Sequence, residues 1–214
     1  MNDSIKNALT MKALIEVDSL YVLEENRPDD KITLNVIGGF ALLLNNVRKN
    51  MTEYTDIDYI GRELPGKLKK IIRAVGIKHG LDVNWINNDS LLEGSSLEDL
   101  EITTGKLNFL PKIELNCFDV YSLCNEDLLR LKMMSIDTTY MALETGENFT
   151  RKKDFSDVKL LMEELNIDIP ALKKMTSDYV LEPAVYDIVS AFNKTGEAVS
   201  KNININFAAS TQVL

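Results

Sequence analysis

One stretch, Thr33 to Ile60, constrains the fold of this 214-residue chain more than any other. It predicts a buried strand, a turn at Gly38 and Gly39, a helix, a polar loop and a second strand that carries Asp56 and Asp58. Side chains alternate along a strand, so the two carboxylates share one face and their apolar neighbours share the other. The stretch therefore predicts two acids beside a glycine turn.

The two features of this stretch suit different parts of one ligand. Glycines between a strand and a helix allow unusual backbone angles, and the helix start that follows favours phosphate. Adjacent carboxylates repel each other unless a cation lies between them, and Mg²⁺ takes oxygen ligands that it shares with phosphates. Each feature alone is commonly only a tight turn or a solvated pair of acids. Together they predict a site for a divalent cation and a phosphate.

Composition limits the classes of partner. The formal net charge is −9, which argues against extended DNA binding but not against a nucleotide held through a metal ion. Basic runs at 67–73 and 151–153 are the candidates for a local RNA-binding patch. No apolar run reaches the roughly 20 residues of a membrane helix, and residues 1–17 do not resemble a signal peptide. Cys117 and Cys124 are expected to be partly buried, reduced thiols of a cytoplasmic protein.

The order of predicted elements indicates an α/β (α+β) fold, with a small mixed sheet flanked by helices. We expect an α/β core over residues 1–123, a helical region packed on it over 124–200, and a tail over 201–214. Predicted strands are 32–37, 55–60, 81–86 and 113–123, and residues 91–110 have no clear assignment. Predicted helices are 40–48, 64–79 with Gly80 as C-cap, one from Asn125 to near Gly146, one N-capped by Asp154, and two opened by Pro170 and Pro183.

A Gly-Gly turn at a strand end, a helix and a strand with alternating aspartates resemble the signature of the nucleotidyltransferase superfamily with DNA polymerase beta-like cores. Within it, the chain resembles the abortive-infection and toxin-type nucleotidyltransferases. The resemblance covers about residues 33 to 165. It includes a WIN run at 85–87, a lysine in the run EDLLRLKMMSI, and the run RKKDFSDVKLLMEEL, which supply Lys132, Arg151, Lys153, Asp154 and Asp157.

This resemblance implies roles for the residues of the opening stretch. Gly38 and Gly39 would hold the triphosphate of a nucleotide, while Asp56 and Asp58 would bind Mg²⁺ or Mn²⁺. Glu114 is the first choice for a third carboxylate ligand of the metal, with Asp119 and Asp82 as alternatives. Two departures from the family pattern are a longer gap before the first aspartate and the lack of an arginine shortly before it.

The resemblance also gives roles to the helical half. Lys132 would contact phosphate, and Asp154 would act as a base or orient Lys132. Without the resemblance, the sequence indicates only an exposed helix lysine at Lys132 and a simple N-cap at Asp154.

The implied function is transfer of a nucleotidyl group from a nucleoside triphosphate to a hydroxyl of an RNA, a protein or a small molecule. The chain would work as a component of a toxin–antitoxin or abortive-infection system, with a cognate antitoxin as partner and no membrane contact. The alternative is a non-catalytic member of the same fold that serves as one partner of a two-protein system.

Overall fold

The computed structural model describes residues 8–25, 31–48, 56–88, 107–144 and 152–196. The chain divides into two compact units, Met1–Glu101 with Lys106–Asn125, and Ile102–Gly105 with Glu126–Leu214. The predicted tail over 201–214, most of the unassigned stretch 91–110, and Arg151 lie outside the described residues.

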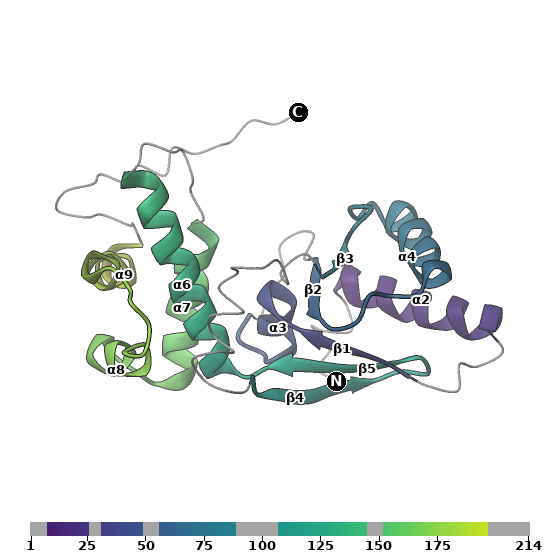
Figure 1. The fold of residues 1–214 in the computed structure, drawn as a ribbon, viewed down its shortest axis with the longest axis horizontal. Coiled ribbons are helices and arrows are strands. Elements are labelled where there is room, and N and C mark those ends of the chain that lie inside the picture. The colour runs from purple at the N-terminus through teal and green to yellow at the C-terminus, as the bar shows by residue number, and fades with distance from the viewer. Residues whose placement is uncertain (1–7, 26–30, 49–55, 89–106, 145–151, 197–214) are drawn as a thin grey trace. The chain divides into compact units, whose positions relative to one another are not determined.

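The first unit holds a mixed five-stranded sheet and three helices among its described residues, which confirms the α/β fold class (Figure 1). The strand order is β3-β2-β1-β5-β4, with β1 antiparallel to β2 and parallel to β5. β3 runs parallel to β2, and β4 runs antiparallel to β5. The elements are α2 (Leu9–Glu25), β1 (Ile32–Val36), α3 (Gly38–Leu44), β2 (Ile57–Ile60), α4 (Gly66–His79), β3 (Ile86–Asn87), β4 (Phe109–Glu114) and β5 (Phe118–Leu123).

The predicted strand–turn–helix–strand order of the opening stretch is confirmed. β2 buries Ile57 and Tyr59, while Asp58 between them is half-buried, as alternation along a strand requires. α3 begins at Gly38, earlier than expected, and nearly all of its residues are buried. The glycine turn is therefore the first turn of a core helix.

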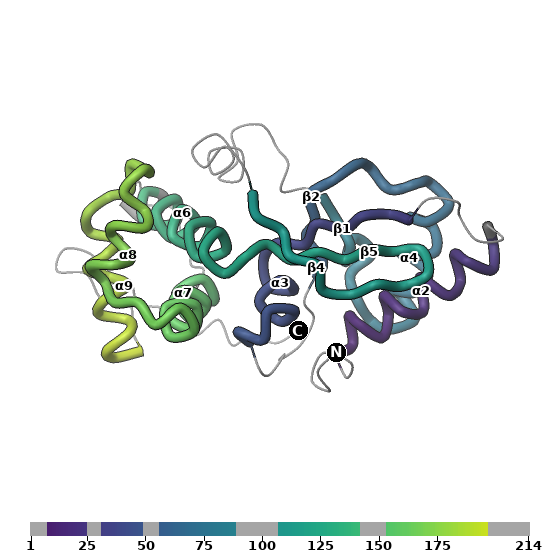
Figure 2. The backbone as a smooth tube through the Cα atoms, turned by 90° about the horizontal axis from the view of Figure 1, so that it is seen from below, coloured from purple at the N-terminus to yellow at the C-terminus, as the bar shows by residue number. Residues whose placement is uncertain are grey.

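Helices α2 and α4 lie side by side in both views of the backbone (Figures 1 and 2). α4 turns Leu68, Ile71, Ile72 and Val75 into the core, which confirms its predicted amphipathic pattern. Gly80 ends the helix in the left-handed conformation with φ 69°, so the predicted C-cap is also confirmed.

The predicted strand over 81–86 is wrong for most of its length, because only Ile86–Asn87 is a strand. Asp82 accepts a hydrogen bond from the Asn84 amide over 2.8 Å, and this local bond forms a turn in place of a strand. Trp85 is fully buried and donates its ring N–H to the Ile72 carbonyl over 2.9 Å. Trp85 contributes to the β-forming composition of residues 81–86, but its side chain serves to anchor helix α4.

The single strand predicted over 113–123 is two strands joined by a tight turn. Asp18 of α2 is buried, and its Oδ1 accepts from the Cys117 amide over 2.7 Å. Its Oδ2 accepts from the amide and the side chain of Asn116 over 3.2 and 2.8 Å. The Asp18 carboxylate accepts the hydrogen bonds of the turn from a helix about 100 positions earlier in the chain. The residues of the turn therefore give no local sequence signal of a hairpin. Pro111 is tolerated because β4 is an edge strand.

The second unit is helical. Its elements are α6 (Asn125–Glu144), α7 (Lys152–Leu165), α8 (Ile169–Met175) and α9 (Pro183–Thr195). The proline starts of the last two helices are confirmed, with Asp168 capping α8 through the Ala171 amide. Asp154 is not an N-cap, because α7 begins at Lys152 and places Asp154 in its first turn. None of the described helices is long and apolar enough to cross a bilayer.

Candidate functional site

Gly38 and Asp58 meet at one end of the sheet. The Ile37 amide donates to the Asp58 carbonyl over 2.9 Å, which aligns the end of β1 with the aspartate on β2. Gly38 has φ 65°, and a Cβ at this position would lie 2.8 Å from Asp58 Oδ2. Glycine is therefore required twice here, by its backbone angle and by the carboxylate that occupies the space of a side chain. The turn and the acid form one packed unit.

Asn87 is a third member of this cluster that the sequence reasoning assigned no role. Its Nδ2 donates to Asp58 Oδ1 over 3.1 Å from the neighbouring strand β3, where the two residues are register partners. One carboxylate oxygen of Asp58 thus faces Gly38 and the other faces an amide, which fixes the rotation of the carboxylate. The signal that could have found Asn87 was present, because it ends the WIN run that the family resemblance includes.

Asp56 and Gly39 occupy the same end of the sheet. Asp56 is exposed and comes directly before β2, two residues from Asp58. Gly39 is buried in the first turn of α3, directly after Gly38. The structure therefore brings together the glycine turn and the aspartate strand, as predicted from the opening stretch.

Glu114 is not at this end of the sheet, which corrects the first choice for a third carboxylate. Its register partner on β5 is Asp119, and Asp119 in turn pairs with Thr33, four residues before Ile37. At about 3.3 Å per residue, this places Glu114 roughly 13 Å along the strands from the level of Asp58.

Glu114 and Asp119 share a different partner. Lys31 Nζ lies 2.5 Å from Glu114 Oε1 and 3.2 Å from Asp119 Oδ1. The hydrogen bond from Lys31 lowers the pKa of Glu114, and the same bond raises the pKa of Lys31. These acids belong to a surface ion pair cluster, and β5 places Ser122, not an acid, level with the end of β1.

The Asp56 and Asp58 carboxylates suit a cation that a phosphate also binds better than a cation held by protein side chains alone. Among the residues that the structure describes, no group of three or more His, Cys, Asp or Glu side chains is arranged to hold a metal ion. Mg²⁺ is commonly held by only one or two carboxylates, with water and substrate phosphates completing its octahedron. Two carboxylates such as Asp56 and Asp58 would be enough for an ion held in that mode.

Lys132 lies in a nearly buried charge cluster in the second unit. Its Nζ is 2.5 Å from Asp154 Oδ1 and 3.0 Å from Asp157 Oδ2, and its side chain is 14% exposed. Ser135 donates to the other oxygen of Asp154 over 2.9 Å. The contact to Asp157 is an ion pair without hydrogen-bond alignment. Spacings of three residues on each helix place these groups on facing sides of α6 and α7.

The geometry bears on both interpretations of these residues. Lys132 is not an exposed helix lysine, and its amine pairs with Asp154, whereas phosphate contact by Lys132 and a role of Asp154 as a base or in orienting Lys132 stay predictions. One cation faces two almost fully buried acids, so the cluster is a structural tie between two helices. Gly38, Asp56 and Asp58 belong to the first unit, and Lys132 and Asp154 belong to the second.

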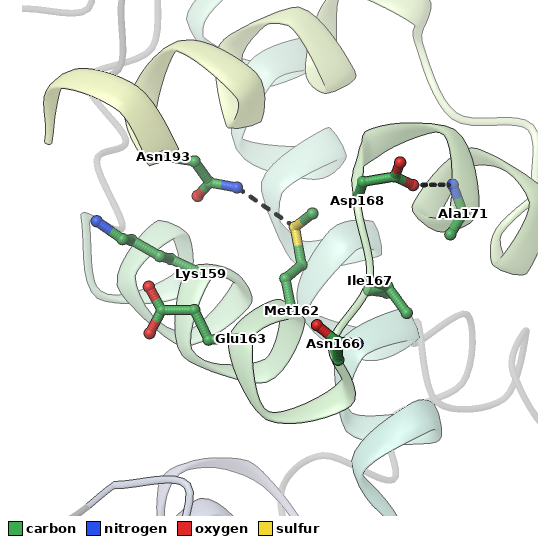
Figure 3. A pocket seen from close by; sticks show the side chains of 8 residues that line it. All are labelled: Lys159, Met162, Glu163, Asn166, Ile167, Asp168, Ala171 and Asn193. Atoms are coloured by element: carbon green, nitrogen blue, oxygen red, sulfur yellow. Dashed lines mark hydrogen bonds between the residues drawn. The ribbon is translucent and has the colours of Figure 1, made fainter.

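A groove of about 570 Å³ opens in the second unit among α7, α8 and α9 (Figure 3). Asn193 crosses it and donates its amide to Met162 Sδ over 3.4 Å. None of the predicted site residues lines this groove. Its lining residues are Lys159, Met162, Glu163, Asn166, Ile167, Asp168, Ala171 and Asn193.

No family model, curated protein or solved structure matches this chain. The nucleotidyltransferase resemblance therefore stays a prediction from the residues that carry it.

Replacing Gly38 tests the packed turn. We expect Gly38→Ala to destabilise the chain more than Gly80→Ala, because both glycines have φ near 65–70° but only Gly38 faces an atom within 4 Å. The added Cβ forces Asp58 off its rotamer and away from Asn87, an excess of about 1 to 2 kcal/mol. Urea unfolding of the two variants measures this difference.

The same pair in an Asp58→Ala background supplies the control for Gly38. Removal of the carboxylate opens the space, so the excess cost of Gly38→Ala over Gly80→Ala should disappear there. Equal destabilisation by the two glycine substitutions in the wild-type background would contradict the close packing of Gly38 and Asp58.

Removing the Lys132 amine tests the charge cluster. Lys132→Met removes a cation that pairs with two almost buried carboxylates, and we expect the unfolding free energy to fall by about 3 to 5 kcal/mol. Lys174→Met, at an exposed position of α8, is the matched control and should change stability by less than about 0.5 kcal/mol.

Neutralising the two acids tests whether the stability lost in Lys132→Met comes from the charges of Asp154 and Asp157. Asp154→Asn and Asp157→Asn, added to the Lys132→Met background, should restore part of the stability, because the uncompensated charge is removed. A Lys132→Met protein as stable as Lys174→Met would mean that the lysine is no structural tie.

Proposed function

We propose that the chain is a metal-dependent nucleotidyltransferase. It transfers a nucleotidyl group from a nucleoside triphosphate to a hydroxyl of an RNA, a protein or a small molecule and releases pyrophosphate. The observation that carries the proposal is the contact of Gly38 with Asp58 at the end of β1 and β2. It supports a site where backbone and carboxylate face one ligand, because only a glycine permits both to approach it closely.

Each residue of the cluster has a part in this proposal. Gly38 and Gly39 present backbone to the triphosphate without a side chain in the way. Asp56 and Asp58 hold one Mg²⁺ together with phosphate oxygens, and Asn87 keeps the Asp58 carboxylate in its orientation. The bound ion would supply positive charge for the phosphates and the leaving pyrophosphate. Positioning the acceptor hydroxyl in line with the triphosphate supplies the rest of the rate enhancement.

The biological setting belongs to the same proposal. By the resemblance, the chain acts within a toxin–antitoxin or abortive-infection system, with a cognate antitoxin as its partner. We place the activity in the cytoplasm, where nucleoside triphosphates are made and where the two buried free thiols, Cys117 and Cys124, stay reduced.

A second candidate is a non-catalytic nucleotidyltransferase-fold protein that binds a partner. Two observations favour it. Glu114 lies at the far end of the sheet, so among the described residues the cluster has two of the three expected acids. Lys132 has its charge balanced by Asp154 and Asp157 within the second unit. Such a protein keeps the fold without the reaction.

Labelled nucleotides distinguish the two functions. The purified chain is incubated with Mg²⁺, each of the four nucleoside triphosphates labelled at the α-phosphate, and total cell extract. We expect label on one class of acceptor. We also expect Asp58→Asn to decrease transfer at least about 100-fold, which exceeds the usual loss of activity when a residue that only hydrogen-bonds to a metal ligand is replaced. The class of molecule that carries the label identifies the acceptor.

Asp119→Asn is the matched control for this experiment. It removes the same charge from the same unit at the Lys31 end of the sheet, so transfer should stay within about twofold of wild type. Equal activity of Asp58→Asn and wild type, or no label with any nucleotide, would exclude the enzyme and leave the binding protein.

A further inference from the structure

Helix α4 differs from the rest of the chain in its charge. Its sequence, GKLKKIIRAVGIKH, holds five lysines and arginines and no acid. With these five cations set aside, the formal net charge of the chain falls from −9 to −14. The helix starts six residues after β2 ends, so the aspartate strand leads directly into it.

The cations share the exposed face of α4. The core side is apolar, and the other half of the circumference is open to solvent. That exposed half contains Lys67, Lys69, Lys70, Arg73 and Lys78, together with Ala74 and Ile77. The face is about 20 Å long at 1.5 Å per residue.

Among the described residues, acids pair with two cations at the edges of this face. Lys69 pairs with Glu63 at 2.5 Å, and Lys78 pairs with Glu16 of α2 at 2.6 Å. In the described part of the chain, Lys70 and Arg73 form no ion pair or side-chain hydrogen bond, although they lie one turn apart at the centre of the face. The centre therefore keeps its positive charge in an acidic protein.

We propose that this face of α4 binds the phosphate backbone of single-stranded RNA. Lysine and arginine on a regular surface neutralise successive phosphates and release counterions, which gives binding without sequence preference. The exposed face carries no aromatic side chain on which bases could stack, so the contact is with the backbone. The assignment of this RNA as the acceptor strand of the transfer rests on the proposed function. Binding of the RNA to α4 does not require the reaction.

An acidic protein is the competing partner for a basic surface. Protein interfaces are enriched in aromatic residues, Met and Arg at their centre and depleted in Lys. The α4 face has the opposite composition, with four lysines, one arginine and only Ile77 as a large apolar side chain. Phosphate is the ligand that this composition favours.

The test measures binding of a fluorescently labelled RNA, an oligouridine of about 12 nucleotides, by anisotropy, with the whole chain, between about 20 and 150 mM salt. Nucleotide and Mg²⁺ are left out, so catalysis has no part in the result. We expect Lys70→Glu with Arg73→Glu to weaken binding at least about tenfold. The same double change should reduce the salt slope by about 1.4, which is about 0.7 for each of two phosphates that the protein no longer neutralises.

The matched control is Lys174→Glu with Lys194→Glu. These exposed lysines lie on α8 and α9, and the double change alters the net charge by the same amount. If the α4 face binds the RNA, binding by this control should stay within about twofold of wild type, because the control changes the net charge equally but leaves that face intact.

Three results would overturn the inference. They are equal weakening in the two double variants, no weakening in either, or displacement of the RNA by polyglutamate as effective as by unlabelled RNA. The last result would assign the face to an acidic protein. RNA binding that the α4 changes weaken, without nucleotidyl transfer by the wild-type chain, would overturn the proposed function alone, whereas any of the three results above with transfer intact would overturn only this inference.

Discussion

The close approach of Gly38 to Asp58 is the constraint on which the candidate site depends. Backbone pairing holds β1 and β2 in register. In this register, the Asp58 side chain occupies the space that a side chain at Gly38 would fill. Asn87 on β3 fixes the remaining oxygen. Three neighbouring segments of the sheet thus position one carboxylate. This explains why a strand, a glycine turn and a strand with alternating acids belong together in the sequence.

Local patterns predicted the parts of the chain whose causes are local. The apolar stripe and glycine end of α4, the alternation along β2 and the proline starts of the last two helices all follow from neighbouring residues. The hairpin of β4 and β5 was missed because its turn is held by Asp18, which comes from a distant helix. Trp85 misled the strand prediction for a related reason, since its bulk and its ring N–H serve the packing of α4.

The same distinction between local and distant causes applies to the candidate site. Gly38 and Asp58 are close in sequence and joined by a strand pair, so their contact follows from the pattern. Glu114 was misplaced because the sequence does not reveal the strand pairing, in which Glu114 lies opposite Asp119 at the Lys31 end of the sheet. Lys132 was found through the family resemblance alone, and its tie to two buried acids depends on helix packing that no local spacing encodes.

The most direct test of the account is nucleotide binding at the Gly38–Asp58 turn, measured as a thermal shift with ATP, GTP, CTP and UTP in the presence and absence of Mg²⁺. A nucleotide at about 100 times its Kd stabilises by about 2.7 kcal/mol, which raises the melting temperature by about 5 °C or more. The account predicts such a shift for at least one nucleotide, dependent on Mg²⁺ and absent in Asp56→Ala. No shift with any nucleotide, or a shift that Asp56→Ala retains in full, would contradict it.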